Sequence, residues 1–276
     1  MDTKNILDKA FKAGLSGASA MSINVLSLMW MRTTINYQYR HGSTMTNAFT
    51  NLYKQGGIPR FYKGLLPALV QGPMSRFGDT ASNMVVKEIF TGSELPVSLQ
   101  TLFASSLASS YRLAVMPVDT LKTIMQVEGN NGMSFLKNKI KKSGPSVLWH
   151  GGIGTSVATF VGHYPWFYTY NKLNEMLPIY NKDECVYKYI ARNGFIGFTS
   201  TMVSDTTSNS IRVLKTYKQT TNLSYPNALQ EIVKNHGVKS LLFRGLTTKL
   251  LSNGIQGFTF TILWQYIQDI MNDNKD

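Results

Sequence analysis

The pattern of hydrophobic and polar positions predicts a chain of alternating long and short helices. Three long apolar segments rich in Gly, Ala and Ser cover about residues 13–31, 102–116 and 193–211. Each is followed by a shorter segment with apolar residues at helical spacing, and these cover 44–55, 133–143 and 225–236. A second long segment then follows in each case, as at 65–90 and 246–270. The pattern therefore predicts six long helices and three short amphipathic ones.

A threefold repeat underlies this alternation. The segment MPVDTLKTIMQ at 116–126 has a second copy at 210–219 and a fainter third copy at 27–36. An aromatic-basic-glycine signal follows each copy and ends at Gly64, Gly151 or Gly245. Two motifs that recur in one order and at one spacing indicate real internal repeats. We therefore expect a single domain over 1–276 made of three pseudo-repeats, at about 8–92, 98–178 and 186–272.

Composition narrows the class of protein. The 28 Lys and Arg residues against 15 Asp and Glu give a net charge of +13, which points to an anionic partner. No window holds about 18 uncharged apolar residues, but helices that line a water-filled cavity can keep a polar face and still span a bilayer. The single cysteine and the scattered histidines predict no disulfide and no metal site. No catalytic motif is recognisable, so we expect a protein that is not an enzyme.

The intact motif Pro117-x-Asp119-x-x-Lys122, with its threefold repetition, resembles the mitochondrial carrier family over essentially the whole chain. The resemblance implies an all-α membrane protein. In this fold, six transmembrane helices in three pseudo-repeats surround a central cavity, with three short amphipathic helices on the matrix side. It also implies a cavity that opens alternately to the two sides of the membrane.

The resemblance implies a matrix gate in which the acid of one repeat pairs with the base of the next. The ring is incomplete here, because Met29 and Arg212 occupy two of the three acid positions. Only Asp119 with Lys215 is expected to pair, so we predict a weak gate, unless other residues compensate. The predicted gate residues are Arg32, Pro117, Asp119, Lys122, Gln126, Arg212, Lys215 and Gln219.

The resemblance implies that the solute binds mid-membrane, at one position on the second long helix of each repeat. Counting from the motif glycines places these positions at Gln71, at Ala158 with Thr159, and at Ser252 with Asn253. Arg112 is a further candidate, since an arginine at membrane depth is costly unless it meets water or an anion; its alternative is a structural ion pair with Asp79 or Asp205. Trp166 can stack on a base, with a lipid-facing aromatic as the alternative. The predicted substrate-binding residues are Gln71, Asp79, Arg112, Ala158, Thr159, Trp166, Ser252 and Asn253.

The motif glycines suggest lipid contacts as well. Gly64, Gly151 and Gly245 each precede a predicted helix, whose N-terminal amides favour phosphate. The resemblance implies that these are cardiolipin sites. We expect no other bound cofactor.

These features predict transmembrane transport, by exchange, of a small anionic metabolite, with nucleotides or deoxynucleotides favoured. A carrier of phosphate or carboxylates is one alternative. A degenerate carrier that acts as a membrane scaffold or receptor is another, because two motif prolines and most gate acids are absent. We expect a monomeric, multi-pass protein of the mitochondrial inner membrane that binds no nucleic acid.

Overall fold

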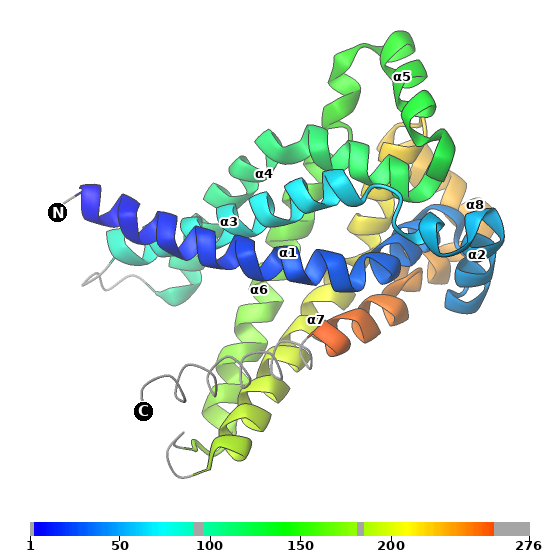
Figure 1. Ribbon diagram of the computed structural model, residues 1–276. Coiled ribbons are helices and arrows are strands. Elements are labelled where there is room, and N and C mark those ends of the chain that lie inside the picture. Colours follow the sequence, from blue (N-terminus) through cyan, green and yellow to red (C-terminus); the bar gives the residue numbers. More distant parts are fainter. Residues whose placement is uncertain (1–2, 91–95, 181–184, 257–276) are drawn as a thin grey trace, which may run out of the picture.

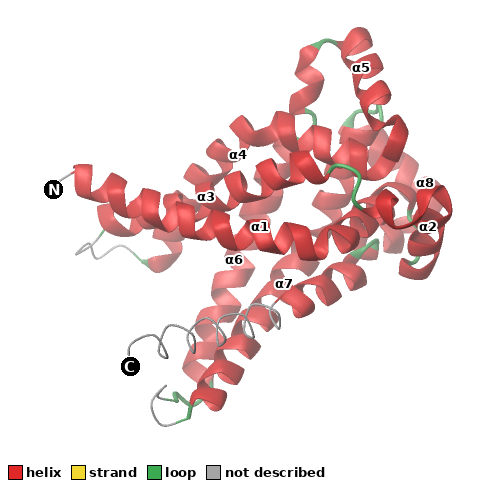
Figure 2. Ribbon diagram, in the orientation of Figure 1, coloured by secondary structure: helices red, strands yellow, loops and turns green. Residues whose placement is uncertain are grey.

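The computed structural model describes residues 3–90, 96–180 and 185–256, and every regular element in these ranges is helical (Figure 2). Residues 246–256 are also helical, and the rest of the sixth predicted long helix lies outside the described residues. The α-helices are α1 (Thr3–His41), α2 (Met45–Phe61), α3 (Leu65–Ile89), α4 (Val97–Glu128), α5 (Gly132–Ser143), α6 (Gly152–Met176), α7 (Val186–Thr220) and α8 (Tyr225–Phe243), with short 3₁₀ helices η1 (Gly129–Asn131) and η2 (Pro145–Trp149).

The long helices pack on one another in chain order. α1 packs on α3, α3 on α4, α4 on α6 and α6 on α7, while α7 also contacts α1 and α4. The short helices α2, α5 and α8 gather at one end of the molecule, at the right and upper right of Figure 1. Each short helix follows the C-terminus of α1, α4 or α7, so these three C-termini lie at the same end.

The motif position differs between α1, where the helical backbone is broken, and α4, where it holds a proline within the helix. In α1 the backbone leaves helical geometry at Leu28 (φ −114°, ψ 17°), next to Ser27, whose Oγ donates to the Ile23 carbonyl at 2.9 Å. In α4 the same position holds Pro117 inside the helix. A proline or a serine bonded back to the preceding turn disturbs the helical hydrogen bonds, which accounts for the break near Ser27.

The short helices are attached through their apolar faces. Ala228 and Ile232 of α8 are buried in a cluster with Ile35 and Tyr39 of α1 and with α7. In the same way α2 packs on α1, and Leu136 of α5 packs on α4. The prediction of amphipathic short helices is therefore confirmed by these contacts.

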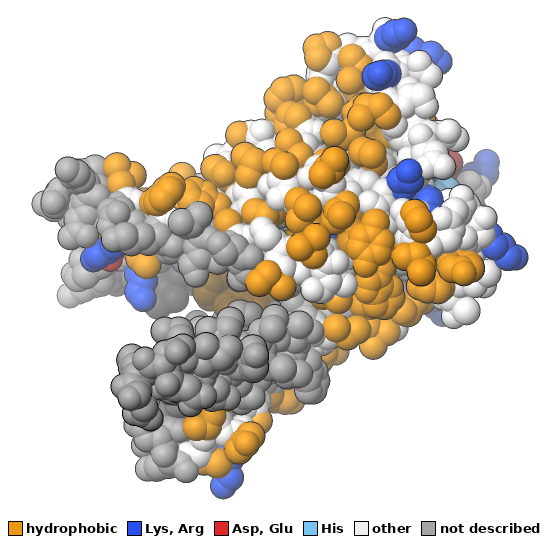
Figure 3. Space-filling model, viewed as in Figure 1, with side chains coloured by type: hydrophobic (Ala, Val, Ile, Leu, Met, Phe, Trp, Pro, Cys, Tyr) orange, Lys and Arg blue, Asp and Glu red, His pale blue; other side chains and the backbone are white. Residues whose placement is uncertain are grey.

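The outer surface of the long helices is largely apolar. Figure 3 shows hydrophobic side chains gathered over these helices, with Lys and Arg towards the ends of the molecule. Large exposed side chains include Leu66, Ile153 and Tyr168, which are 78%, 73% and 63% exposed. Among the described helices, none combines the length and the sustained apolar character needed for a membrane span.

Candidate functional site

The Asp119 carboxylate is the centre of a buried ion-pair cluster between α4 and α7. Its Oδ1 lies 2.8 Å from Lys122 Nζ, and its Oδ2 lies 2.7 Å from Lys215 Nζ. Gln219 Nε2 also donates to Asp119 Oδ2 at 3.1 Å. The pair expected between Asp119 and Lys215 is thus present, and the same acid also holds the base of its own repeat. The Asp119 carboxylate therefore forms ion pairs with two lysine ammonium groups.

The contact between α1 and α4 at the same level is neutral. Asn36 Nδ2 donates to Gln126 Oε1 at 2.5 Å, and Gln126 Nε2 lies 3.5 Å from the sulfur of Met29. Met29 and Gln126 are fully buried. Amides and a thioether therefore take the place that an acid–base pair would occupy between the first and second repeats.

Arg32 and Arg212 lie in the same region without acidic partners. Arg32 donates to Asn24 Oδ1 at 3.0 Å, and Arg212 Nε donates to Ser208 Oγ at 3.2 Å. Within the described ranges, no carboxylate lies within 4.0 Å of either guanidinium. Both charges are therefore held by neutral groups.

Arg112 makes a two-point contact between helices. Its Nε and Nη2 donate to the two oxygens of Asp79 at 3.1 and 2.5 Å, and its Nη1 donates to Thr159 Oγ1 at 3.2 Å. The ion pair with Asp79 that the sequence offered as an alternative is therefore present, and the binding role of Arg112 stays a prediction. This contact joins α3, α4 and α6 and brings together three of the predicted substrate-binding residues.

Gln71 connects the predicted solute site to the Asp119 cluster. Lys122 Nζ donates to Gln71 Oε1 at 2.8 Å, while Gln71 Nε2 donates to Ser75 Oγ at 2.9 Å. Lys122 is therefore shared between a predicted binding residue on α3 and the acid on its own helix. A ligand at Gln71 would reach the gate lysine directly.

A third polar cluster surrounds Asp205 on α7. Lys249 Nζ lies 2.5 Å from its Oδ1, and Asn253 Nδ2 donates to its Oδ2 at 2.5 Å. Ser252 is buried one residue before Asn253. Sequence reasoning missed Lys249, although its position one helical turn before Asn253 would have placed it on the same face.

Trp166, which was predicted to stack on a base, points towards α7. Trp166 stacks on Tyr170 with ring centroids 5.0 Å apart, and its Nε1 donates to Thr201 Oγ1 at 3.3 Å. One face of the indole is thus covered, and only the other is left for the predicted stacking on a base. Ala158, also predicted to bind solute, is buried in α6.

The three motif glycines share one conformation. Gly64 and Gly151 precede α3 and α6 with φ of 83° and 98°, and Gly245 precedes the helix at 246–256 with φ of 69°. Left-handed backbone of this kind favours glycine. The structure thus places each glycine at a helix start, as predicted, and the lipid contacts themselves remain a prediction.

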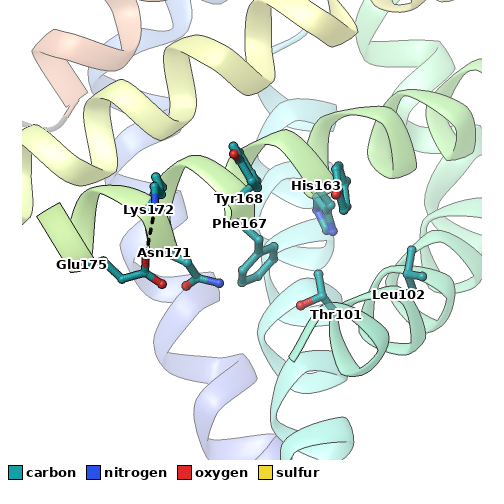
Figure 4. A pocket seen from close by; sticks show the side chains of 9 residues that line it. Thr101, Leu102, His163, Phe167, Tyr168, Asn171, Lys172 and Glu175 are labelled. Carbon is teal, nitrogen blue, oxygen red and sulfur yellow. Dashed lines mark hydrogen bonds and ion pairs between the residues drawn. The ribbon is translucent and has the colours of Figure 1, made fainter. Parts of the chain in front are cut away.

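A separate cavity of about 320 Å³ lies between α4 and α6. Figure 4 shows that most of its lining comes from one face of α6, with Thr101 and Leu102 contributed by α4. It contains none of the predicted substrate-binding residues. The remaining lining residues are His163, Tyr164, Phe167, Tyr168, Asn171, Lys172 and Glu175.

Comparison with known proteins agrees with the repeat. The family model described as "Mitochondrial carrier protein" matches three successive segments, 3–94, 96–181 and 187–275. Among curated proteins, the chain is similar to "Mitochondrial uncoupling protein 4C" of Drosophila melanogaster, with 25% identity over 133 residues. That alignment covers 44% of this chain and 39% of the relative.

Proposed function

This chain belongs to the mitochondrial carrier family, and from that premise we propose that it moves a small anionic metabolite across a membrane by alternating access. Members of the family are transporters of metabolites and not enzymes, so the prediction that the chain is not an enzyme is confirmed. The resemblance inferred from the repeated motifs is confirmed by the same match. The solute, the exchange mechanism and the membrane belong to the proposal.

The excess of positive charge among the clustered side chains carries the proposal. Six basic residues occur with three acids, Asp79, Asp119 and Asp205. The positive charges of Arg32 and Lys215 act on Lys122, and that of Arg212 acts on Lys249. The charges of Arg112 and Arg212 both act on His163. Unbalanced positive charge of this kind attracts an anion. The six bases are Arg32, Arg112, Lys122, Arg212, Lys215 and Lys249.

The size of this excess favours a phosphorylated solute. Three positive charges remain after the three acids are matched, whereas a monocarboxylate offers only one negative charge. A phosphate ester carries about −1.5 to −2 at pH 7, and further phosphates add to this. We therefore favour nucleotides or deoxynucleotides, taken up by exchange, over monocarboxylates or inorganic phosphate, and di- or tricarboxylates stay as an alternative.

The protein is proposed to be a monomer that crosses the mitochondrial inner membrane several times. The exposed apolar side chains of the long helices, such as Leu66 and Ile153, support contact with lipid. The clustered polar groups lie between those helices, where water and solute are expected. Anionic phospholipid is proposed to bind at the helix starts that follow Gly64, Gly151 and Gly245.

Uptake into liposomes containing the purified protein tests the proposal. Labelled nucleotides and deoxynucleotides are supplied outside, with unlabelled ones inside. We expect saturable uptake that requires internal nucleotide. Uptake of phosphate or carboxylates alone would overturn the nucleotide assignment. Folded protein without any uptake would favour a scaffold or receptor, which the loss of the gate acids at Met29 and Arg212 also allows.

A further inference from the structure

Three buried basic side chains cross between repeats at the end where the short helices lie. The first is Arg60, near the end of α2. Its Nη1 and Nη2 donate to the carbonyls of Gln126 and Val127, at 2.9 and 2.6 Å. These carbonyls belong to the last turn of α4, so Arg60 of the first repeat caps the motif helix of the second.

Lys139 of α5 makes the equivalent contact from the second repeat to the third. Its Nζ donates to the carbonyls of Lys218 and Gln219 at 3.2 and 2.9 Å, and also to that of Thr221. These three carbonyls lie at the end of α7. The ammonium thus places all three of its protons on backbone acceptors of one helix terminus.

Arg244 closes the circle from the third repeat to the first. Its Nη1 donates to the carbonyl of Tyr39 at 3.2 Å and to that of Arg40 at 3.5 Å, in the last turn of α1. Its Nε also donates to Ser240 at 3.1 Å. In each contact, a basic residue in or just after the short helix of one repeat donates to the C-terminus of the first long helix of the next repeat. The three contacts therefore follow one another around the molecule in the same direction.

The chemistry of a helix terminus explains why cations occupy these places. The last carbonyls of a helix lack partners within the helix and carry its negative dipole end. Arg60, Lys139 and Arg244 are only 3%, 3% and 5% exposed. Buried charges need such partners to be tolerated, and within the described residues no carboxylate pairs with any of the three.

We propose that Arg60, Lys139 and Arg244 hold the gate side of the cavity closed, in place of the missing acid–base pairs, and that they release when the cavity opens there. The proposal rests on the proposed transport function. Two observations support the proposal. The acid–base ring supplies only one described pair between repeats, Asp119 with Lys215. The basic caps, in contrast, connect the first repeat to the second, the second to the third and the third to the first.

Lys139 makes one of these caps sensitive to pH. Burial, and secondarily the positive charge of Lys218, lowers the pKa of the Lys139 ammonium from its usual value to about 8. Burial and the positive charges of Lys218 and Lys139 lower the pKa of the nearby His150 to about 4, so His150 is neutral in this pH range. The Phe135 ring lies 6.0 Å from Lys139 Nζ on the same helix. Because the exposed ammonium of an open cap has the higher pKa, protonation favours release of Lys139, and the closed cap gains stability as the pH rises from about 8 towards 10.5.

Hydrogen exchange tests the cap without relying on transport. In wild-type protein we expect amides at 216–221 to become better protected, relative to those at the ends of α1 and α4, when the pH rises from 7 to 9. Lys139→Arg keeps its charge and should remove this selective change. Lys139→Gln, which removes the cap and cannot titrate, should exchange faster than wild type at both pH values without the selective change, and the exposed Lys141→Gln should match wild type. A wild type without the selective change would overturn the proposal.

The gate role is tested in liposomes loaded with labelled nucleotide. We expect Lys139→Gln to raise efflux several-fold at pH 7, and Lys139→Arg to abolish the fall in efflux that wild type shows above pH 8. Altered exchange with unaltered efflux from an active carrier would overturn the gate role. If nucleotide does not move at all in wild type, the proposed function fails, while the exchange result still decides whether Lys139 is a pH-dependent cap.

Discussion

Arg112 and Asp79 face each other across α4 and α3 through two hydrogen bonds, of 3.1 and 2.5 Å. This geometry is the two-point fork that a guanidinium forms with a carboxylate. A carboxylate or phosphate of the solute would present oxygens to Arg112 in the same way. Asp79 therefore occupies Arg112 in the absence of solute, and an anionic solute must compete with it.

Replacing Arg112 and Asp79 one at a time distinguishes a structural role of their ion pair from a role of Arg112 in solute binding. Arg112→Ala is expected to abolish uptake of an anionic solute while the protein stays folded, because Thr159 and Asp79 cannot hold an anion alone. Asp79→Asn should keep transport and lower the apparent KM, since it frees the guanidinium. The measurement is initial uptake rate against solute concentration, with the exposed Arg76→Ala as control. Equal loss in both variants, with a lower melting temperature, would mean that the pair is structural.

Gln71 is predicted to couple solute binding to release of the Asp119 cluster. Lys122 Nζ is bonded both to Gln71 Oε1 and to Asp119 Oδ1, each at 2.8 Å. A hydrogen bond to a charged group contributes about 1.5–3 kcal/mol, so Gln71→Leu should raise the KM at least about tenfold. Ser75→Ala, which removes only the contact on the other side of Gln71, should have a much smaller effect. Equal kinetics in Gln71→Leu and wild type would exclude the coupling.

Restoring an acid at position 212 is predicted to strengthen the gate. Arg212→Asp removes one like charge and supplies a partner for Arg32, whose described contacts are with neutral groups. A partly exposed pair contributes up to about 1 kcal/mol, so efflux without external counter-solute should fall up to about fivefold. Arg212→Gln is the matched control, because it removes the charge without adding the acid. Identical efflux in the two variants would show that relief of repulsion alone is responsible.

The sequence was informative wherever a pattern recurs. The apolar spacing at 133–143 predicted α5 to within one residue at its start, and the motif alignment placed Asp119 against Lys215. The sequence did not predict the basic caps, because the three residues make the same kind of contact from different positions in their repeats. Arg60 lies four residues before its motif glycine, whereas Arg244 lies one residue before. Every residue has a backbone carbonyl, so the sequence does not indicate which carbonyl accepts a hydrogen bond, and such contacts are identified only in the structure.

Gly151 is predicted to be required for the contact between α6 and α7. It has φ of 98° and precedes α6, and a Cβ added there would lie 3.0 Å from Gln219 Cγ and 3.1 Å from Lys215 Cγ. Gly151→Ala therefore combines strain of about 1–3 kcal/mol at a left-handed residue with a displacement of the two side chains bound to Asp119. We expect a melting temperature lower by several degrees and faster efflux.

Two other glycines separate these effects. Gly144 has φ of 79° but open space around its Cβ position, so Gly144→Ala should lower the melting temperature without changing efflux. Gly194, inside α7, has neither a left-handed backbone nor a close neighbour, and Gly194→Ala should stabilise the helix slightly. Faster efflux in Gly151→Ala alone would tie the gate to the packing of Gly151 against Lys215 and Gln219. Equal efflux in Gly151→Ala and Gly144→Ala would contradict that link, because backbone strain is all that the two variants share.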